Sequence, residues 1–205
     1  MPKKIRVVIA EDEAIIRLDL KESLEAEGYA VIGETGRGDE AIDLVRMLEP
    51  ELVILDIKMP GMNGIDAAKI ISDEGLAAVI LLTAFSQQDL IQEASNAGVL
   101  AYLVKPFQRS DLVPSIELAL GRFKEISNLK QETEMLRQSL ETRKLVDRAK
   151  GLLIDNYGLK ESDAYRYLQK KAMEDRTTMK AVAEDILSDT SPVDSDSTEK
   201  MDKKL

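Results

Sequence analysis

The sequence contains no cysteine and no histidine. The absence of cysteine excludes disulfide bonds and thiolate chemistry, and it is typical of proteins in a reducing cytosol. The absence of histidine excludes Ser–His and Cys–His catalytic pairs and most zinc sites. Any chemistry performed by this chain must therefore use carboxylates, hydroxyls, amines and the backbone.

Long apolar segments are also missing. The sequence has no apolar run of the roughly 18 residues that a membrane-spanning helix needs. The first residues, MPKKIRVVIAED, lead directly into a strand-like run and leave no room for a signal peptide. We therefore expect a cytoplasmic protein with no membrane partner.

Charge is distributed unevenly along the 205 residues, whose net charge is −10. Residues 1–121 carry 21 acids and 11 bases, whereas residues 122–205 carry 17 of each. Within the second part, residues 143–180 hold ten bases and six acids. An acidic module followed by a locally basic one suggests two different tasks, although two solvated surfaces would give the same balance.

Apolar runs alternate with amphipathic stretches through the first 121 residues. The runs predict five strands, at residues 5–10, 30–33, 52–56, 78–83 and 101–104. The amphipathic stretches predict helices that begin near Glu13, Gly38, Gly64, Gln87 and Ser110. Five such βα units predict an α/β fold with a right-handed, doubly wound, five-stranded parallel sheet.

The fifth helix is predicted to continue past this sheet. Between Ser110 and residue 142, the only breaker residues are Pro114, which we place in the first turn where proline is tolerated, and Gly121. The a and d positions of a heptad then hold Ile126, Leu129, Thr133, Leu136 and Leu140. This spacing predicts a short coiled coil over residues 122–142, with a solvated linker helix as the alternative.

Three helical patterns follow and predict a small bundle over residues 143–187. The first runs to about Asn156, the second from about Glu161 to Met173 and the third from about Thr178 to Leu187. Gly158 can end the first helix, and Thr177 is the predicted N-cap of the third. The predicted core positions include Leu145, Ala149, Leu152, Leu153, Ala164, Leu168, Ala172, Met179, Val182, Ala183 and Ile186. Residues 188–205 lack apolar periodicity and are expected to be disordered.

Chemically useful side chains stand at the ends of the predicted strands. Glu11 and Asp12 follow the first strand, and Asp56 ends the third. Because ligands of parallel sheets bind at the carboxyl ends of the strands, these carboxylates should meet at one edge. Their mutual repulsion favours a bound divalent cation, and oxygen ligands suit Mg²⁺. Taken alone, Asp56 could equally be a residue that caps a turn.

The fourth and fifth strands add Thr83 and Lys105 at the same edge. A hydroxyl and an ammonium group beside the carboxylates could neutralise a phosphoryl group placed on Asp56. Phosphoryl transfer depends mainly on positioning and on charge neutralisation. These residues therefore point to a phosphoryl-transfer site.

Residues 5–121 resemble the receiver domain of bacterial response regulators. The matching motifs are AEDE, LVILDIKMPGMNG, LLTAFS and AYLVKPF, in the family's order and spacing. The resemblance implies a flavodoxin-like sheet of strand order 2-1-3-4-5 over residues 1–121. It also implies that Asp56 accepts phosphate from the phosphohistidine of a sensor histidine kinase.

The resemblance further assigns roles around Asp56. Mg²⁺ would be held by Glu11, Asp12, Asp56 and the backbone carbonyl of Lys58. Thr83 and Lys105 would bind phosphoryl oxygens, and Tyr102 occupies the position of the family's switch aromatic. Many receivers have two aspartates where this chain has Glu11-Asp12, and the longer glutamate arm can reach the metal through water.

Basic and aromatic residues are interleaved in the second half. At 100° per residue, Arg143 and Lys150 lie on one side of their helix, opposite the stripe at 145, 149 and 152. Arg166 and Lys170 lie opposite the second stripe in the same way. The sequence places Tyr157, Tyr165 and Tyr167 near these bases. This combination suits the unstacked bases of RNA loops better than the duplex reading of a DNA-recognition helix.

Residues 140–187 resemble an ANTAR domain, the RNA-binding antitermination module of some response regulators. The match lies in ETRKLVDRAKGLLI and in SDAYRYLQKKAMEDRTTMKAVAEDIL. The resemblance implies binding to tandem hairpins in nascent leader transcripts. The candidate RNA-binding residues are Arg143, Lys144, Arg148, Lys150, Arg166, Lys170, Arg176 and Lys180.

Together these features predict a phosphorylation switch that forms a homodimer and binds RNA. We expect no enzymatic activity beyond the chain's own phosphoryl transfer and dephosphorylation, and no small-molecule substrate. The alternatives are a DNA-binding response regulator and a protein-binding adaptor.

Overall fold

A computed structural model describes residues 4–84 and 97–188, which divide between two compact units, Met1–Leu129 and Lys130–Leu205. The first unit contains a five-stranded sheet of order β2-β1-β3-β4-β5, in which every paired strand is parallel. The strands are β1 (Arg6–Ala10), β2 (Ala30–Thr35), β3 (Leu52–Asp56), β4 (Ala78–Ala84) and β5 (Ala101–Lys105). The predicted sheet and its strand order are confirmed.

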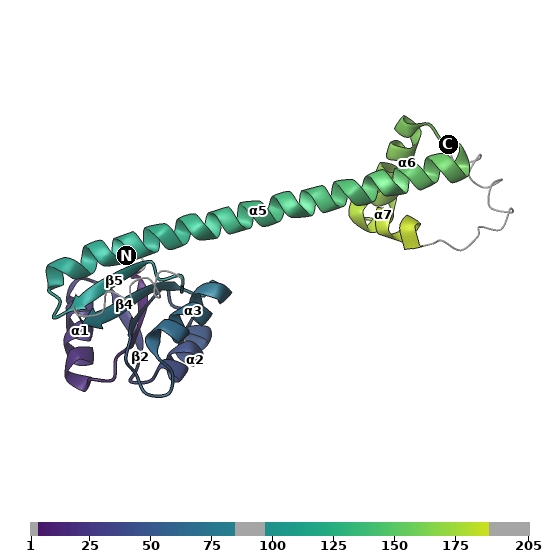
Figure 1. Ribbon diagram of the computed structural model, residues 1–205. Coiled ribbons are helices and arrows are strands. Elements are labelled where there is room, and N and C mark those ends of the chain that lie inside the picture. Colours follow the sequence, from purple (N-terminus) through teal and green to yellow (C-terminus); the bar gives the residue numbers. More distant parts are fainter. Residues whose placement is uncertain (1–3, 85–96, 189–205) are drawn as a thin grey trace. The chain divides into compact units, whose positions relative to one another are not determined.

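Helices cover both faces of this sheet (Figure 1). They are α1 (Ala14–Ala26), α2 (Gly38–Leu48), α3 (Gly64–Glu74) and the first turns of α5 (Arg109–Tyr157). Because successive strand side chains point to opposite faces, Val53 packs in the layer of α2 and α3, whereas Ile54 packs in the layer of α1 and α5. All five residues of β3 are buried, as expected for a central strand covered on both sides.

The loop that follows Asp56 is held by two close backbone contacts. Gly64 starts α3 at a point where a Cβ atom would lie 1.9 Å from the backbone oxygen of Asp56. Gly38 starts α2 where a Cβ atom would lie 2.1 Å from the backbone oxygen of Met62. Both glycines are required because no side chain fits there, and they fix the backbone that carries Asp56.

Helix α5 is continuous for 49 residues, which confirms that the fifth helix extends beyond the sheet. Its start at Arg109 places Pro114 at the sixth position. The prediction of Pro114 in the first turn was therefore wrong. The predicted start near Ser110 was within one residue, but a turn holds only about 3.6 residues, so Pro114 lies in the second turn. The predicted heptad side chains of Ile126, Leu129, Leu136 and Leu140 are exposed. Coiled-coil pairing over 122–142, and the domain boundaries at 121 and 143, stay predictions.

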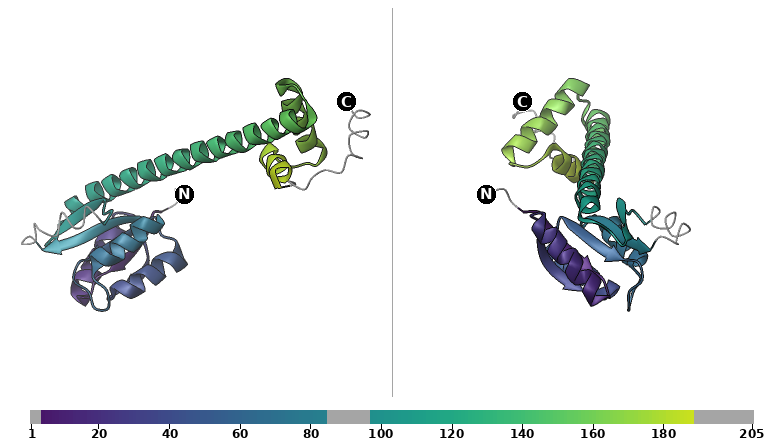
Figure 2. Two further views of the ribbon diagram at one scale, coloured as in Figure 1. Left: turned by 45° about the vertical axis from the view of Figure 1, so that its right-hand side comes forward. Right: turned by 90° about the vertical axis from the view of Figure 1, so that its left-hand side faces the viewer.

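The second unit packs α6 (Glu161–Glu174) and α7 (Met179–Ser188) against the C-terminal part of α5 (Figure 2). The shared core contains Ala149, Leu153, Ala164, Leu168 and Val182. Its small residues allow close helix approach, and the predicted three-helix bundle is confirmed. Val146 and Ile154 also pack in this core but were absent from the predicted stripe.

The ends of the bundle helices follow local rules. Gly158 adopts the left-handed conformation with φ 66°, and its N–H donates to the carbonyl of Ile154, which ends α5 as predicted. The N-cap of α7 is Thr178, whose Oγ1 accepts a hydrogen bond from the N–H of Ala181 at 3.2 Å. The prediction of Thr177 was therefore wrong by one residue. Thr177 instead donates its N–H to Ala172 at the end of α6.

Two predictions lie outside the described residues. These are the helix near Gln87 and residues 189–205 of the predicted disordered tail. The tail was predicted from Ser188, which is instead the last residue of α7. Among the described residues, no helix is both long enough and apolar enough to cross a lipid bilayer.

We predict that Gly64→Ala destabilises the chain, by the roughly 1–3 kcal/mol typical of overpacking. The matched control is Gly121→Ala in α5, where a Cβ atom would meet nothing within 4 Å. Because alanine favours a helix over glycine by about 1 kcal/mol, this control should not destabilise the chain. Urea unfolding followed by circular dichroism measures both changes, and equal stability of the two variants would contradict the prediction.

Candidate functional site

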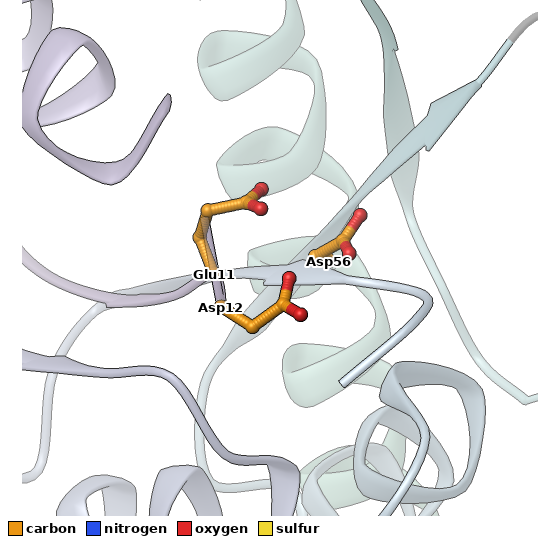
Figure 3. Close-up of side chains that lie close together, drawn as sticks. All are labelled: Glu11, Asp12 and Asp56. Atoms are coloured by element: carbon orange, nitrogen blue, oxygen red, sulfur yellow. The ribbon is translucent and has the colours of Figure 1, made fainter. Parts of the chain in front are cut away.

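Three carboxylates converge at the carboxyl edge of the sheet. Glu11 and Asp12 directly follow β1, and Asp56 is the last residue of β3, which pairs with β1. One oxygen of each side chain lies within 4.8 Å of the others (Figure 3). Glu11 and Asp56 are buried, whereas Asp12 is exposed. The cluster therefore presents two inner carboxylates and one that faces solvent.

Lys105 neutralises the two buried carboxylates. Its Nζ lies 2.6 Å from Oε2 of Glu11 and 2.8 Å from Oδ1 of Asp56. The Lys105 side chain is 17 % exposed, so these ion pairs are largely shielded from water. Lys105 is the last residue of β5, the outermost strand on that side of the sheet, and its long side chain extends past β4 to the centre of the sheet.

Burial and neighbouring charges perturb the acid–base balance of this cluster. Burial raises the pKa of Glu11, and the charge of Asp56 adds to the increase, while the Lys105 ammonium opposes it. Burial by itself would lower the pKa of Lys105, but its contacts with Asp56 and Glu11 outweigh this effect, so its pKa is raised. Lys105 is therefore cationic at neutral pH, and Glu11 pays a desolvation cost for its charge.

The donor set fits a hard divalent cation. Oε2 of Glu11 is buried and has no hydrogen bond within the described part of the chain, although it forms the ion pair with Lys105. Asp12 and Lys58 line an open groove of about 530 Å³ that also contains Asn63. Carboxylate and carbonyl oxygens beside a solvent-filled groove suit Mg²⁺, which keeps several water ligands.

Thr83 and Tyr102 lie on the two strands beyond β3. Thr83 is buried, 6 % exposed, and pairs with Val104 in the register of β4 and β5. Tyr102 is 51 % exposed on β5. The roles of both residues in phosphate binding and switching stay predictions.

Several residues that position Glu11 were not identified from the sequence. Thr35 accepts a hydrogen bond from the N–H of Glu11 through its backbone oxygen at 3.0 Å. Arg17 donates from Nη1 to the backbone carbonyl of Glu11. The N–H of Glu13 donates to Oε1 of Glu11 at 3.3 Å. The strand order implied by the resemblance already places β1 beside β2, but the hydrogen bond between these particular residues and the orientation of the Arg17 side chain leave no signal in a single sequence.

The basic residues of the second unit fall into two groups. Arg143 and Lys150 both approach Asp147, at 4.0 and 2.9 Å, so they share one side of α5 as predicted. Lys150 also contacts Glu161 at 3.1 Å and is only 15 % exposed. These contacts raise the pKa of Lys150 and lower the pKa of Asp147. The ammonium of Lys150 thus connects α5 to the first residue of α6.

The remaining RNA candidates are more accessible. Lys180 approaches Glu184 at 3.9 Å, and Lys170 is exposed on α6. Four others are exposed and have no ion pair with any residue that the structure describes: Lys144, Arg148, Arg166 and Arg176. The structure therefore leaves these four guanidinium and ammonium groups available to an external anion.

We predict that Glu11→Gln stabilises the metal-free chain at pH 7 and weakens its response to Mg²⁺. Because the pKa of Glu11 is raised in the folded chain, the stability associated with its protonated form is lost as pH rises through that raised pKa. The neutral amide of Glu11→Gln avoids this loss, so in EDTA at pH 7 the variant should have the higher Tm. The difference in Tm between the variant and the parent should shrink as the pH approaches about 4, where Glu11 of the parent is also protonated. Thermal unfolding across pH, with and without Mg²⁺, checks both effects. A lower Tm for the variant in EDTA at pH 7 would contradict the first effect.

Two family models match the chain. Residues 7–117 match the response regulator receiver domain, and residues 134–187 match the ANTAR domain. The transcriptional regulatory protein PdtaR from Mycobacterium tuberculosis is 56 % identical over 182 residues, which cover 89 % of each chain. The chemotaxis protein CheY from Thermotoga maritima is 42 % identical over 112 residues, or 54 % of this chain and 93 % of CheY.

Solved structures agree with the fold of the first unit. The signal receiver domain of NarL from Mycobacterium tuberculosis aligns with a TM-score of 0.56 and 28 % identity. The alignment covers 58 % of this chain and 98 % of that domain. The two family models, the similarity to PdtaR over 89 % of both chains and the receiver fold of the solved structure agree with one another. The chain therefore belongs to the two-component response regulators, with an N-terminal receiver domain and a C-terminal ANTAR domain.

Proposed function

We propose that this chain is a transcription antiterminator, phosphorylated on Asp56 by a sensor histidine kinase, that binds tandem hairpins in nascent leader RNA. One observation carries the proposal: a receiver-type carboxylate site and an ANTAR domain occur in the same chain. The receiver domain supplies an input that depends on phosphate, and the ANTAR domain supplies an output that acts on RNA.

Asp56 is the proposed nucleophile. One of its carboxylate oxygens attacks the phosphorus of a phosphohistidine on the kinase. The P–O bond forms as the P–N bond breaks, and the electron pair of the P–N bond returns to the imidazole nitrogen. In this proposal the chain performs only this transfer and the later hydrolysis of its own acyl phosphate, and small phosphodonors such as acetyl phosphate serve only as replacements for the kinase.

The neighbours of Asp56 neutralise the incoming charge. Lys105 already contacts Asp56 at 2.8 Å and can pass to a phosphoryl oxygen without leaving the site. The proposed Mg²⁺ ligands are Glu11, Asp12, Asp56 and the backbone carbonyl of Lys58. Bound Mg²⁺ would offset the negative charge of the phosphoryl oxygens in the transition state. Thr83 is the proposed hydroxyl donor to the phosphoryl group, and Tyr102 is the proposed switch residue.

The ANTAR domain is the proposed RNA-binding part. Lys144, Arg148, Arg166 and Arg176 are exposed without ion pairs to described residues, which suits them to phosphate contacts. Binding should weaken steeply with salt, because each phosphate contact releases counterions. A homodimer would bring two such domains to two hairpins, and the second contact would gain from the high effective concentration.

Helix α5 is the proposed dimerisation element. Leu136 and Leu140 occupy consecutive a and d positions, and each is 60 % exposed. Leucines this exposed on one side of a helix are stabilised when the same side of a second copy covers them. Phosphorylation on Asp56 would favour this pairing.

We predict that Asp56→Asn abolishes phosphorylation by acetyl phosphate in the presence of Mg²⁺, because the amide is a poor nucleophile. The matched control is Asp73→Asn, an exposed aspartate on α3 away from the sheet edge, which should be phosphorylated like the parent chain. Phosphate-affinity electrophoresis measures both. Phosphorylation of the Asp56 variant at the parent level would refute the assignment of the phosphoacceptor.

We also predict that the phosphorylated parent chain binds hairpin RNA in preference to duplex DNA of matched sequence. Gel shifts at several salt concentrations measure this preference. Tighter binding to duplex DNA would favour a DNA-binding regulator. Absence of binding to either nucleic acid, even at low salt, would favour a protein-binding adaptor.

The dimer prediction uses two side chains of nearly equal exposure in α5. Leu136→Ala should weaken dimerisation of the phosphorylated chain by roughly tenfold or more, since burying a leucine side chain is worth about 2 kcal/mol. Met135, 59 % exposed but outside the a and d positions, provides the control Met135→Ala. Analytical ultracentrifugation measures the dissociation constants, and equal effects of the two substitutions would count against a dimer formed through these heptad positions.

A further inference from the structure

The three tyrosines of the second unit differ in their surroundings. Tyr157 and Tyr167 are partly buried and pack against the core that contains Ala149 and Leu168. Tyr165 lies on the exposed side of α6, with 47 % of its surface accessible. Of these three rings, Tyr165 is therefore the one that presents a large free surface to a partner.

Tyr165 belongs to a row of exposed side chains along α6. With 3.6 residues per turn, Tyr165, Gln169 and Met173 follow one another on the same side of the helix. Met173 is 71 % exposed, which is unusual for a long apolar side chain on the face opposite a helical core. Methionine side chains are flexible and are common on surfaces that adapt to a ligand.

A basic row runs beside this apolar row. Arg166 and Lys170 each follow a residue of the apolar row by one position in the sequence, which places them about 100° around α6 from Tyr165 and Gln169. Both are exposed. Arg166 has no ion pair with a described residue. Around the helix between Tyr165 and Lys170 lie residues 162, 169 and 173, none of which is acidic. Glu161, one turn before Tyr165, is acidic but forms an ion pair with Lys150 at 3.1 Å. Asp163 and Glu174 lie beyond Lys170, on the other side of the basic row.

We propose that this face of α6 is a base-stacking platform, on which the ring of Tyr165 stacks against an unpaired base of an RNA hairpin loop. Met173 lies two turns, about 12 Å, further along the helix and contacts the neighbouring nucleotide, while Arg166 binds the phosphate between the two. A flat ring beside a cation matches a nucleotide, which combines a π-face with an anionic phosphate. Tyrosine and arginine are also common in protein interfaces, and the match to the ANTAR domain is what favours RNA as the occupant. The proposal rests on the RNA-binding function and adds the residue that contacts a base.

A salt titration of RNA affinity distinguishes a stacking role of Tyr165 from the role of a phosphate-binding residue. Loss of a stacking ring lowers affinity at every salt concentration and leaves the slope of log K against log salt unchanged. Loss of one phosphate contact lowers the magnitude of the slope by about 0.7–0.9. Tyr165→Ala should therefore shift the line downward, whereas Arg166→Gln should make it less steep.

The probe is the RNA segment recovered by crosslinking the full chain to transcripts in its own cells. We expect Tyr165→Ala to weaken binding of the phosphorylated chain to this RNA by roughly 5- to 150-fold, the range for removal of one stacking side chain. Tyr165→Phe keeps the ring and should bind within about threefold of the parent. Because the side chain is exposed, both variants should keep the parent's circular dichroism spectrum and Tm.

A second pair of variants tests the apolar row. Met173→Ala should weaken binding several-fold. The control is Met47→Ala, since Met47 is 70 % exposed on α2 of the receiver domain and outside the proposed RNA surface. Replacement of the loop bases of the probe by abasic sites should remove the difference between the parent and Tyr165→Ala.

The outcomes separate this proposal from the proposed function. If the parent chain binds no hairpin RNA, the RNA-binding function itself fails. If the parent binds and Tyr165→Ala binds equally well, the stacking platform is wrong while the RNA-binding function stands. If Tyr165→Ala changes the dimerisation constant but not RNA affinity, the face serves a second copy of the chain, which also overturns the proposal.

Discussion

The ammonium group of Lys105 holds the functional edge of the receiver domain together. It lies 2.6 Å from Glu11 and 2.8 Å from Asp56, two buried carboxylates that would otherwise repel each other. Burial makes these charges expensive, and it also makes them sensitive to any added charge. A phosphoryl group on Asp56 competes with Glu11 for the same cation. The site is therefore arranged so that a covalent change at one oxygen redistributes the partners of several charged groups.

The sign of the charges limits how the signal can reach RNA. The proposed phosphorylation would add negative charge to residues 1–121, which already carry 21 acids against 11 bases. Direct electrostatics would therefore repel RNA rather than attract it. An increase in RNA affinity must come from a change in conformation or in oligomeric state. Helix α5, which begins in the receiver domain and ends in the ANTAR domain, is the element that both domains share.

The sequence was sufficient for the sheet because each strand is a short apolar run, and the edge residues follow from the ends of those runs. It was also sufficient for the alanine-rich core of the bundle, where a spacing of four residues identifies Ala164, Leu168 and Ala172. The sequence did not predict contacts between residues that are distant in the chain. The bridge from Lys150 to Asp147 and Glu161, and the contact of Gly64 with the backbone of Asp56, depend on tertiary packing. The error at Thr177 arose because one hydrogen bond, from the N–H of Ala181 to Oγ1 of Thr178, decides which of two adjacent threonines is the N-cap.

In the proposed mechanism, the charge state at Asp56 sets the RNA affinity of the ANTAR domain. The most direct test measures, on one preparation of the full chain, the dissociation constant for hairpin RNA with Mg²⁺ alone and with Mg²⁺ plus beryllofluoride, which mimics a phosphoryl group. The account predicts that beryllofluoride tightens RNA binding, and that removing it restores the weaker constant. Identical constants in the two conditions would contradict the account.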